Sequence, residues 1–176
     1  MQRRGDLIPP PRRLLAGDIP AALEIYREAV LSQAPGLYSP DQVRAWSDLA
    51  LLPGVLDEPL QQGYGLISEG PQQAEAFAVL HPPDRIALLY CRGGSSRQGR
   101  GSQLLQALEA EAQRHGCSAL HTEASQLSRP LFLKRGWEQV APEQILIGGI
   151  PFERYRMRKH LPGLHERLKA SAPASP

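Results

Sequence analysis

The most constraining feature of this chain is a glycine-rich segment between an apolar run and an amphipathic run. Residues 92–102 read Arg-Gly-Gly-Ser-Ser-Arg-Gln-Gly-Arg-Gly-Ser. The preceding residues 86–91 are apolar on both faces, which predicts a central strand. Residues 99–115 follow with Leu104, Leu105 and Leu108 at helical spacing, and Gly116 stands where a left-handed cap belongs. The pattern predicts a strand–loop–helix unit, and the 16 glycines and 17 prolines exclude a plain helix bundle.

This loop has the features of a phosphate-binding loop. Glycines let backbone N–H groups converge, and the first turn of a helix adds unpaired donors and a positive dipole end. Three arginines are placed to reach phosphates at the rim: Arg92, Arg97 and Arg100. We therefore expect a diphosphate held mainly by main-chain amides. A flexible surface loop with incidental arginines is the competing interpretation.

Other phosphate and nucleophile motifs fit this loop poorly. A P-loop needs Gly-Lys-Ser/Thr, and the segment contains no lysine. The dinucleotide fingerprint needs a third glycine where Leu104 stands. A nucleophile elbow is excluded because Ser96 is followed by Arg97 and Gln98 rather than by x-Gly.

The rest of the chain predicts alternating strands and helices. A first short strand begins near Arg12, and helices follow after Asp18 and after the capping box of Ser39 and Gln42. A short helix is expected over 126–135. Further strands are expected over 63–68, 74–80, 86–91, 118–123, 137–147 and 150–158. The order β-α-α-β-β-β-α-β-α-β-β predicts an α/β (α+β) fold: a mixed, mostly antiparallel sheet of about seven strands with helices on both faces.

Length and charge predict one domain with two tails. The 176 residues suit a single domain over 12–161, with a flexible basic N-terminal arm over 1–11 and a flexible tail over 162–176. Basic residues gather at the ends, whereas residues 16–153 carry more acidic than basic side chains. Such a distribution argues against nucleic-acid binding. Without stacking aromatics beside it, the arginine- and glycine-containing loop is also a weak candidate for an RNA contact.

Several functional classes are excluded by what the sequence lacks. No apolar run approaches the ~20 residues of a membrane helix, and no secretory signal is recognisable, so we expect a cytoplasmic protein that contacts no membrane. Two cysteines exclude a disulfide scaffold and a four-cysteine zinc module. His115, Cys117 and His121 straddle a helix end, a turn and a strand with no fourth ligand nearby, so we expect no metal.

The element order, with Gly99-x-Gly101 opening a helix that continues Leu104-Leu105, resembles the GNAT N-acetyltransferases over about residues 12–161. The family loop Gln/Arg-x-x-Gly-x-Gly/Ala reads here as residues 96–101, with Ser96 in the leading position. A second family stretch, Asn-x-x-Ala-x-x-Phe-Tyr-x-x-x-Gly-Phe, has its counterpart in residues 125–137 with its spacing preserved. Within the family, the chain is similar to a bacterial subgroup related to the YafP type, through residues 38–40 with Trp46 and residues 123–125 leading to 129–130.

The resemblance implies a three-layer GNAT-like fold that binds acetyl-CoA as a co-substrate. It implies that the amides of residues 97–102 hold the pyrophosphate, and that the pantetheine arm pairs like a strand with residues 89–91. A backbone N–H near the thioester would stabilise the oxyanion. The expected cofactor-binding residues are Leu89, Tyr90, Cys91, Arg97, Gln98, Gly99, Arg100, Gly101, Ser102, Ser125 and Phe132.

The usual residues for proton transfer are absent. The tyrosine that serves many relatives as general acid is Phe132 here, and two positions that are often acidic are Ala87 and Val79. Local candidates are Glu123, which could act as a base or cap the following helix, and Tyr38, which could donate a proton, bind substrate or simply pack.

Three more residues are secondary candidates. Trp46 is a candidate pocket wall or core residue, and Tyr155 would face the cleft only if strand alternation places it there. His81, at the start of a turn, is expected to be solvated. Cys91 is expected to be an apolar filler that supplies backbone contacts rather than a nucleophile.

Two functions remain open at this point. The first is an acetyl-CoA-dependent N-acyltransferase, of the class that transfers groups other than aminoacyl, in which a primary amine of a small molecule or amino-acid-like acceptor attacks directly in a ternary complex. The second is a catalytically silent acyl-CoA-binding sensor. This alternative stays open because Ala87 and Phe132 stand where relatives often have residues for proton transfer. The sequence leaves open the identity of the acceptor and whether the chain forms a homodimer.

Overall fold

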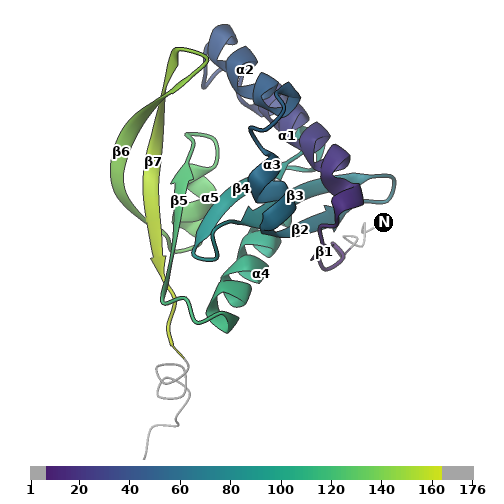
Figure 1. Cartoon of the computed structure of the whole chain (residues 1–176), viewed down its shortest axis with the longest axis vertical. Helices are drawn as coiled ribbons and strands as arrows, with labels where there is room; N and C mark the ends of the chain where they lie inside the picture. Colours follow the sequence, from purple (N-terminus) through teal and green to yellow (C-terminus); the bar gives the residue numbers. More distant parts are fainter. Residues whose placement is uncertain (1–6, 164–176) are drawn as a thin grey trace, which may run out of the picture.

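The computed structural model describes residues 7–163, and its centre is a seven-stranded sheet with the order β1-β2-β3-β4-β5-β7-β6 (Figure 1). Every neighbouring pair is antiparallel except β4 and β5, which are parallel. The strands are β1 (Arg12–Arg13), β2 (Tyr64–Glu69), β3 (Ala74–Leu80), β4 (Arg85–Cys91), β5 (Ala119–Ala124), β6 (Glu138–Ile147) and β7 (Ile150–His160). This sheet confirms the predicted fold class.

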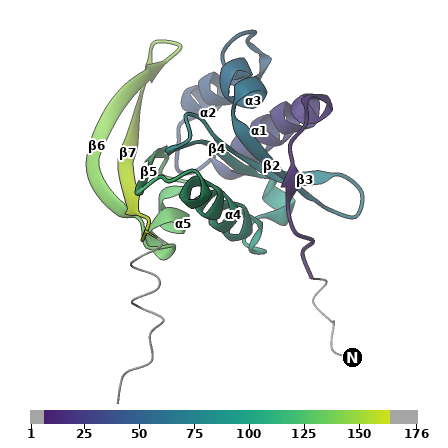
Figure 2. The same ribbon diagram turned by 60° about the horizontal axis from the view of Figure 1, so that its bottom comes forward.

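Helices cover both faces of the sheet, as Figure 2 shows. One face carries the first three helices and the other carries the last two. The helices are α1 (Ile19–Gln33), α2 (Pro40–Ser47), α3 (Asp57–Gln62), α4 (Arg100–Arg114) and α5 (Arg129–Lys134). Two separate apolar cores result, because each helix layer has only its own face of the sheet to bury against.

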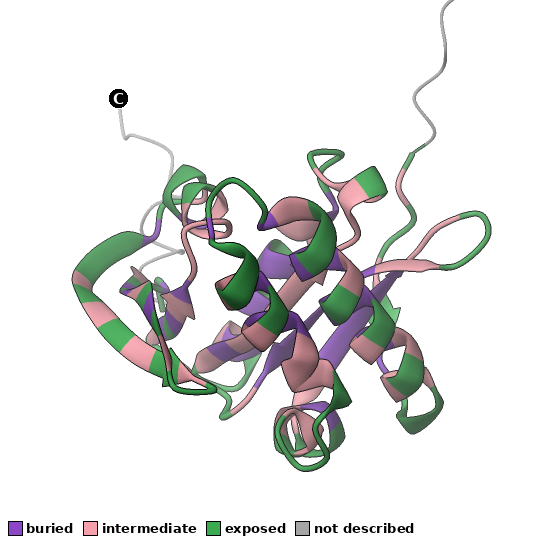
Figure 3. Ribbon diagram, turned by 90° about the horizontal axis from the view of Figure 1, so that it is seen from above, coloured by how far each residue is buried: buried purple, intermediate pink, exposed green. Residues whose placement is uncertain are grey.

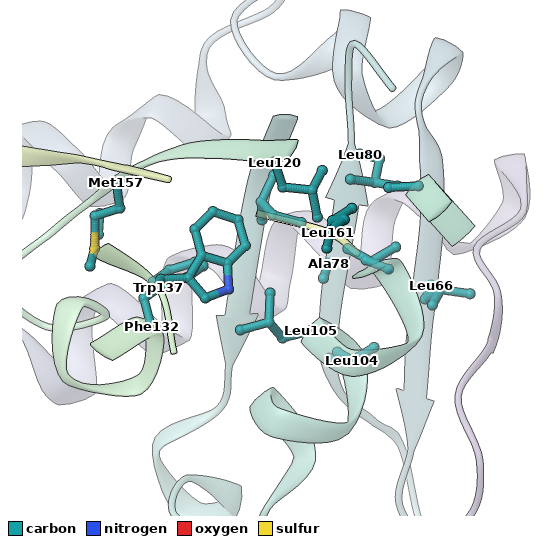
Figure 4. Close-up of a cluster of buried hydrophobic side chains, with 14 of the residues drawn as sticks. Leu66, Ala78, Leu80, Leu104, Leu105, Leu120, Phe132, Trp137, Met157 and Leu161 are labelled. Carbon is teal, nitrogen blue, oxygen red and sulfur yellow. The ribbon is translucent and has the colours of Figure 1, made fainter. Parts of the chain in front are cut away.

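The core under α4 and α5 is assembled from alternate strand residues and the apolar stripe of α4 (Figure 4). Leu104, Leu105 and Leu108 are fully buried there, as their spacing predicts. Phe132 of α5 packs edge-on against Trp137, with ring centroids 5.0 Å apart. The Trp137 indole donates 2.9 Å to Glu109, so its buried N–H is satisfied.

The core on the opposite face joins α1 and α2 to β2, β3, β4 and β7. The buried stripe of α1 consists of Ala22, Ile25, Tyr26, Ala29 and Val30. At the start of α2, Ser39 and Gln42 form the predicted capping box: each side chain bonds the other residue's backbone N–H. Burial is therefore concentrated in the sheet centre and inner helix faces, whereas the edge strand β6 consists of exposed and partly buried residues (Figure 3).

The parallel strands β4 and β5 are paired at only two positions, Arg85 with His121 and Ile86 with Thr122. The Thr122 hydroxyl donates 2.9 Å to the Ile86 carbonyl at the last pair. Immediately afterwards Ala87 is an extra residue in β4, because Ile86 faces Leu80 and Leu88 faces Val79. This β-bulge turns β4 away from β5 and opens the sheet beyond it.

The observed elements differ from the predicted ones in a few places. The helix α3 was not expected, because its six residues carry two acids and a proline and show no apolar periodicity. The last helix begins at Arg129 rather than near residue 126, since residues 125–128 form a turn. At the N-terminus, residues 7–11 of the expected flexible arm are described, and the Ile8 carbonyl lies 3.5 Å from the Gln103 amide of α4. Residues 1–6 of the arm and 164–176 of the tail lie outside the described residues.

Candidate active site

A cavity of about 1180 Å³ lies where β4 and β5 part, and it connects the two faces of the sheet. On one side it is bounded by the start of α4 and by α5. We call this the α4-side half, defined by Gly99, Gly101, Ser102, Ser128 and Leu131. On the other side it is bounded by the residues around α2 and by the β6–β7 hairpin. This is the α2-side half, defined by Leu37, Leu49, Leu56, Ile145, Ile147 and Phe152.

The glycines at the start of α4 have geometric reasons to be glycine. Gly99 is the N-cap residue with φ +97°, a backbone conformation that side chains rarely adopt. A Cβ on Gly101 would stand 3.0 Å from Cδ2 of Leu131, so that position has little room for a side chain. Both conditions bring backbone, rather than side chains, to the cavity surface at the N-terminal turn of α4. A helix start of this kind offers free N–H groups to an anion.

Of the three loop arginines expected at the rim, only Arg97 lines the cavity. The expectation is wrong for the other two side chains. The Arg92 Nε donates 3.0 Å to the Ala74 carbonyl. The Arg100 guanidinium turns inward and donates to the Ser68 hydroxyl at 2.8 Å and to the Glu69 carbonyl at 2.9 Å. Arg100 therefore keeps only its backbone N–H as a direct ligand candidate.

The inward turn of Arg100 leaves a positive charge beneath the loop. Arg100 is 6% exposed, and its Nε has no hydrogen-bond partner. No ion pair to it occurs within residues 7–163, since Ser68 and the Glu69 main chain are neutral partners. Arg97 and Lys134, the last residue of α5, add two cations to the cavity lining itself. The α4-side half thus combines main-chain donors with positive charge, which suits a phosphorylated ligand.

The cavity edge of β4 exposes backbone hydrogen-bonding groups. Antiparallel pairing alternates, and Arg92 N donates to Glu75 O, so the N–H and C=O of Leu89 and Cys91 face away from β3, toward the gap. The Cys91 carbonyl already accepts a 2.7 Å hydrogen bond from the Gln33 side chain at the end of α1. An extended amide-containing chain could pair with this edge as an added strand.

Glu123 is held by an ion pair across the neck of the cavity. Its Oε2 accepts from Arg85 Nη2 at 2.6 Å and from Nε at 2.9 Å. The capping alternative is wrong, because the carboxylate bonds Arg85 at the far end of β4 rather than the helix that follows. Since Leu120 and Ala124 of β5 pack into the core under α4, strand alternation puts Glu123 on the opposite face, toward the α2-side half.

Tyr38 reaches from the segment between α1 and α2 to the loop after β5. Its phenol oxygen accepts a 2.9 Å hydrogen bond from the backbone N–H of Gln126. In the same loop Ser125 and Ser128 bond each other reciprocally through hydroxyls and backbone N–H groups. Burial is the main cause that raises the pKa of Tyr38 above its ordinary value, so the phenol stays protonated at neutral pH. The Ser125 side chain also interacts with this oxygen, and the protonated hydroxyl retains the capacity to donate.

The remaining predicted residues fall into packing and polar roles. Trp46 is both core and cavity wall, and its indole N–H points at the Tyr90 hydroxyl 3.4 Å away. Phe132 borders the cavity but is 2% exposed and belongs to the α4 core. Tyr155 donates to Glu153 while Arg129 stacks on its ring. His81, expected to be solvated, lies 3.1 Å from Glu58.

The Cys91 thiol lies in an unfavourable setting for a nucleophile. Burial raises its pKa to about 11, and Arg100 opposes the shift only in part. Within the described chain, no three His, Cys, Asp or Glu side chains lie close enough to hold a metal ion. The same residues contain no helix long and apolar enough to cross a membrane.

Sequence reasoning missed two polar residues of the site, Arg85 and Gln33. Arg85 begins a strand and Gln33 ends a helix, so each resembles an ordinary surface position. Only the pairing of β4 with β5 brings Arg85 to Glu123, and only the packing of α1 on β4 brings Gln33 to Cys91. The apolar α2-side wall was also not predicted, because its residues come from segments that are up to 115 positions apart in the chain, from Leu37 to Phe152.

The acetyltransferase (GNAT) domain family matches residues 37–159, most of the chain. The chain belongs to the GNAT acetyltransferase family. No curated protein matches it.

Solved GNAT structures share the fold over nearly their whole length. A GCN5-related N-acetyltransferase (aminotransferase, class II) from Rhodopseudomonas palustris superposes with a TM-score of 0.82 at 26% identity, covering 88% of this chain and 98% of that one. PaiA N-acetyltransferase from Thermoplasma acidophilum in complex with coenzyme A gives 0.62 at 18%, covering 85% and 97%. The putative acetyltransferase yncA from Salmonella typhimurium with acetyl-CoA gives 0.60 at 20%, covering 94% and 98%.

The residues of this GNAT chain fit acetyl-CoA on structural grounds. The glycine-supported start of α4, the free edge of β4 and the cations Arg97 and Lys134 lie on one continuous cavity. Main-chain donors with positive charge match phosphates, and a free strand edge matches an amide-containing arm.

Proposed function

We propose that this GNAT protein transfers an acetyl group from acetyl-CoA to a primary amine of a small molecule or amino-acid-like acceptor, by direct attack in a ternary complex. One observation carries the proposal: a single cavity joins the anion-suited start of α4 to a separate wall on the opposite face of the sheet. Two ligands entering from opposite faces would meet where β4 and β5 part. Acetyl-CoA supplies the activated acyl group, and the chain's own residues position it and handle protons.

The α4-side half would hold the cofactor. The amides of residues 97–102 would bind the pyrophosphate, with the Arg97 side chain and the Arg100 charge beneath it contributing electrostatically. The backbone groups of Leu89 and Cys91 would pair with the pantetheine arm. The Gln33 side chain would then either release the Cys91 carbonyl to the arm or keep its hydrogen bond to that carbonyl beside the arm. Tyr90, Ser125 and Phe132 would border the arm, with Phe132 acting through packing alone.

Proton transfer would involve Tyr38 and Glu123. Tyr38 retains its proton at neutral pH, so it would donate to the departing thiolate in place of the hydroxyl that Phe132 lacks. Glu123, oriented by its hydrogen bonds to Arg85, would accept a proton from the incoming ammonium, directly or through water. Trp46 would form part of the acceptor wall.

The closer relationship to the YafP-like subgroup remains a prediction from the sequence.

The decisive experiment is release of free CoA from acetyl-CoA with a panel of amines, run beside calorimetric titration with CoA. Amine-dependent CoA release supports the transferase. Binding of CoA with no turnover on any amine would support instead the silent acyl-CoA-binding module, for which the buried Phe132 is the specific observation. Absence of CoA binding would exclude both functions.

A further inference from the structure

The α2-side half of the cavity has apolar walls. Its six defining residues come from four segments: the loop before α2, the turns after α2, and both strands of the β6–β7 hairpin. Trp46 adds an aromatic surface to the same side. Leu37 is 51% exposed although it lines the cavity, so the apolar surface continues from the wall to the mouth.

The charged residues on this half are already neutralised by protein partners. Glu123 is paired with Arg85, and Arg154 with Glu143 at 2.5 Å. Glu153 also lines the cavity, and its hydrogen-bond partner, the Tyr155 hydroxyl, is neutral; strand alternation places Glu153 with Tyr155 on the α4 face rather than with Phe152. Within residues 7–163, the lining residues Arg85, Glu123 and Arg154 of the α2-side half each have an ionic partner already, with Glu143 shared between Arg154 and Arg156, so a second ammonium or a carboxylate would have to compete with an existing ion pair.

Polar and apolar residues occupy different parts of the α2-side half. The pair Arg85–Glu123 lies at the neck, next to the last paired residues of β4 and β5. The apolar walls lie farther out, where Ile145 and Phe152 face each other across the hairpin register. A molecule that matches this order has one amine at one end and an apolar body at the other.

We propose that the acceptor is a primary amine with a single charge carried on an apolar alkyl or arylalkyl body, and that polyamines and amino acids are poor acceptors, which narrows the proposed function to its small-molecule branch. This inference rests on the proposed function, because it concerns the acceptor of that same site. The physical reason is desolvation: a second charge placed against the apolar wall would lose its hydration without gaining a partner.

Three amines of matched length test the inference with the intact protein and acetyl-CoA. Hexylamine, 1,5-diaminopentane and 6-aminohexanoate share the same pentamethylene chain and differ at the far end, which is methyl, ammonium or carboxylate. We expect kcat/KM for hexylamine to exceed that for either charged analogue by at least about tenfold.

A pair of neighbouring substitutions sharpens the test. Ile147→Asp introduces a carboxylate into the wall and should shift the preference toward the diamine by about tenfold or more. Leu146→Asp is the matched control, because Leu146 is 71% exposed at the same hairpin tip and does not line the cavity. It should leave the ranking of the three amines unchanged.

The outcomes separate the inference from the function on which it rests. Equal kcat/KM for the three amines, or preference for a charged analogue, overturns the inference and leaves the transferase intact. Acetylation of other amines, such as peptide N-termini, with no turnover of hexylamine does the same. If CoA binds but no amine is acetylated, the proposed function fails, and the inference with it. The wild-type comparison does not depend on any variant folding.

Discussion

The phenol oxygen of Tyr38 accepts a 2.9 Å hydrogen bond from the backbone N–H of Gln126, linking the segment before α2 to the loop after β5. These two segments flank the opening between β4 and β5 from opposite sides. Tyr38 also packs its ring edge-on against Trp46, with centroids 5.3 Å apart. One side chain thus joins the two segments and is part of the cavity lining.

Replacing Tyr38 by phenylalanine should lower kcat by roughly a hundredfold, because it removes a general acid while keeping the ring. The measurement is steady-state CoA release at saturating acetyl-CoA and amine. CoA affinity by calorimetry should change far less than kcat. A Tyr38→Phe enzyme with unchanged kcat would show that the hydroxyl is structural only.

Replacing Gly99 by alanine should weaken CoA binding by roughly tenfold, because a side chain at φ +97° strains the turn that aims the amides. Gly94→Ala is the matched control in the same loop, since nothing lies within 4 Å of a Cβ there and its φ is not positive. Calorimetric titration with CoA gives both affinities. Equal weakening in the two variants would contradict the role given to Gly99.

Replacing Glu123 by glutamine should lower kcat/KM for the amine by at least about tenfold, because the proton acceptor is lost. Glu143→Gln provides the control, since Glu143 is also paired with an arginine, Arg154, but does not line the cavity. Its thermal stability should fall by an amount similar to that of Glu123→Gln while its activity persists. Loss of stability without loss of activity at Glu123 would reduce that residue to a structural ion pair.

Alkylation of Cys91 by iodoacetamide should be slow at pH 8 and rise up to about pH 11. Burial raises the pKa of this thiol from 9.0 to about 11, which reduces the thiolate fraction at pH 8 roughly a hundredfold relative to the unfolded chain. Peptide mass analysis after timed labelling measures the rate. The same chain in urea serves as the reference, and rapid labelling of the folded protein near neutral pH would refute the assignment of Cys91 as an inert filler.

Local patterns were sufficient to predict most elements of the fold. Three of these patterns each involve only a few neighbouring residues: the apolar stripe of Leu104, Leu105 and Leu108, the capping box of Ser39 and Gln42, and the glycine at the start of α4. Each depends on backbone geometry or periodicity that acts over one or two turns. For the same reason α3 was missed, since six residues with little periodicity carry no such signal.

Side-chain direction at the site was harder to predict. The loop arginines look equivalent in sequence, yet Arg100 turns inward to Ser68 and Arg92 turns to the Ala74 carbonyl. Both directions depend on which strand lies beneath the loop. The pairing of Glu123 with Arg85 likewise depends on the parallel contact of β4 with β5, 38 residues apart along the chain.

The sequence by itself determined the layered fold, the glycine-framed start of α4 and the absence of the usual tyrosine at Phe132, because these follow from residue identity and short-range periodicity. Tertiary structure alone decided the rest. The bulge at Ala87 separates β4 from β5, Tyr38 reaches across the opening, and leucines and isoleucines from distant segments form one apolar wall. A cavity forms where the surfaces of distant segments face each other, and long-range strand pairing and helix packing decide which surfaces do so.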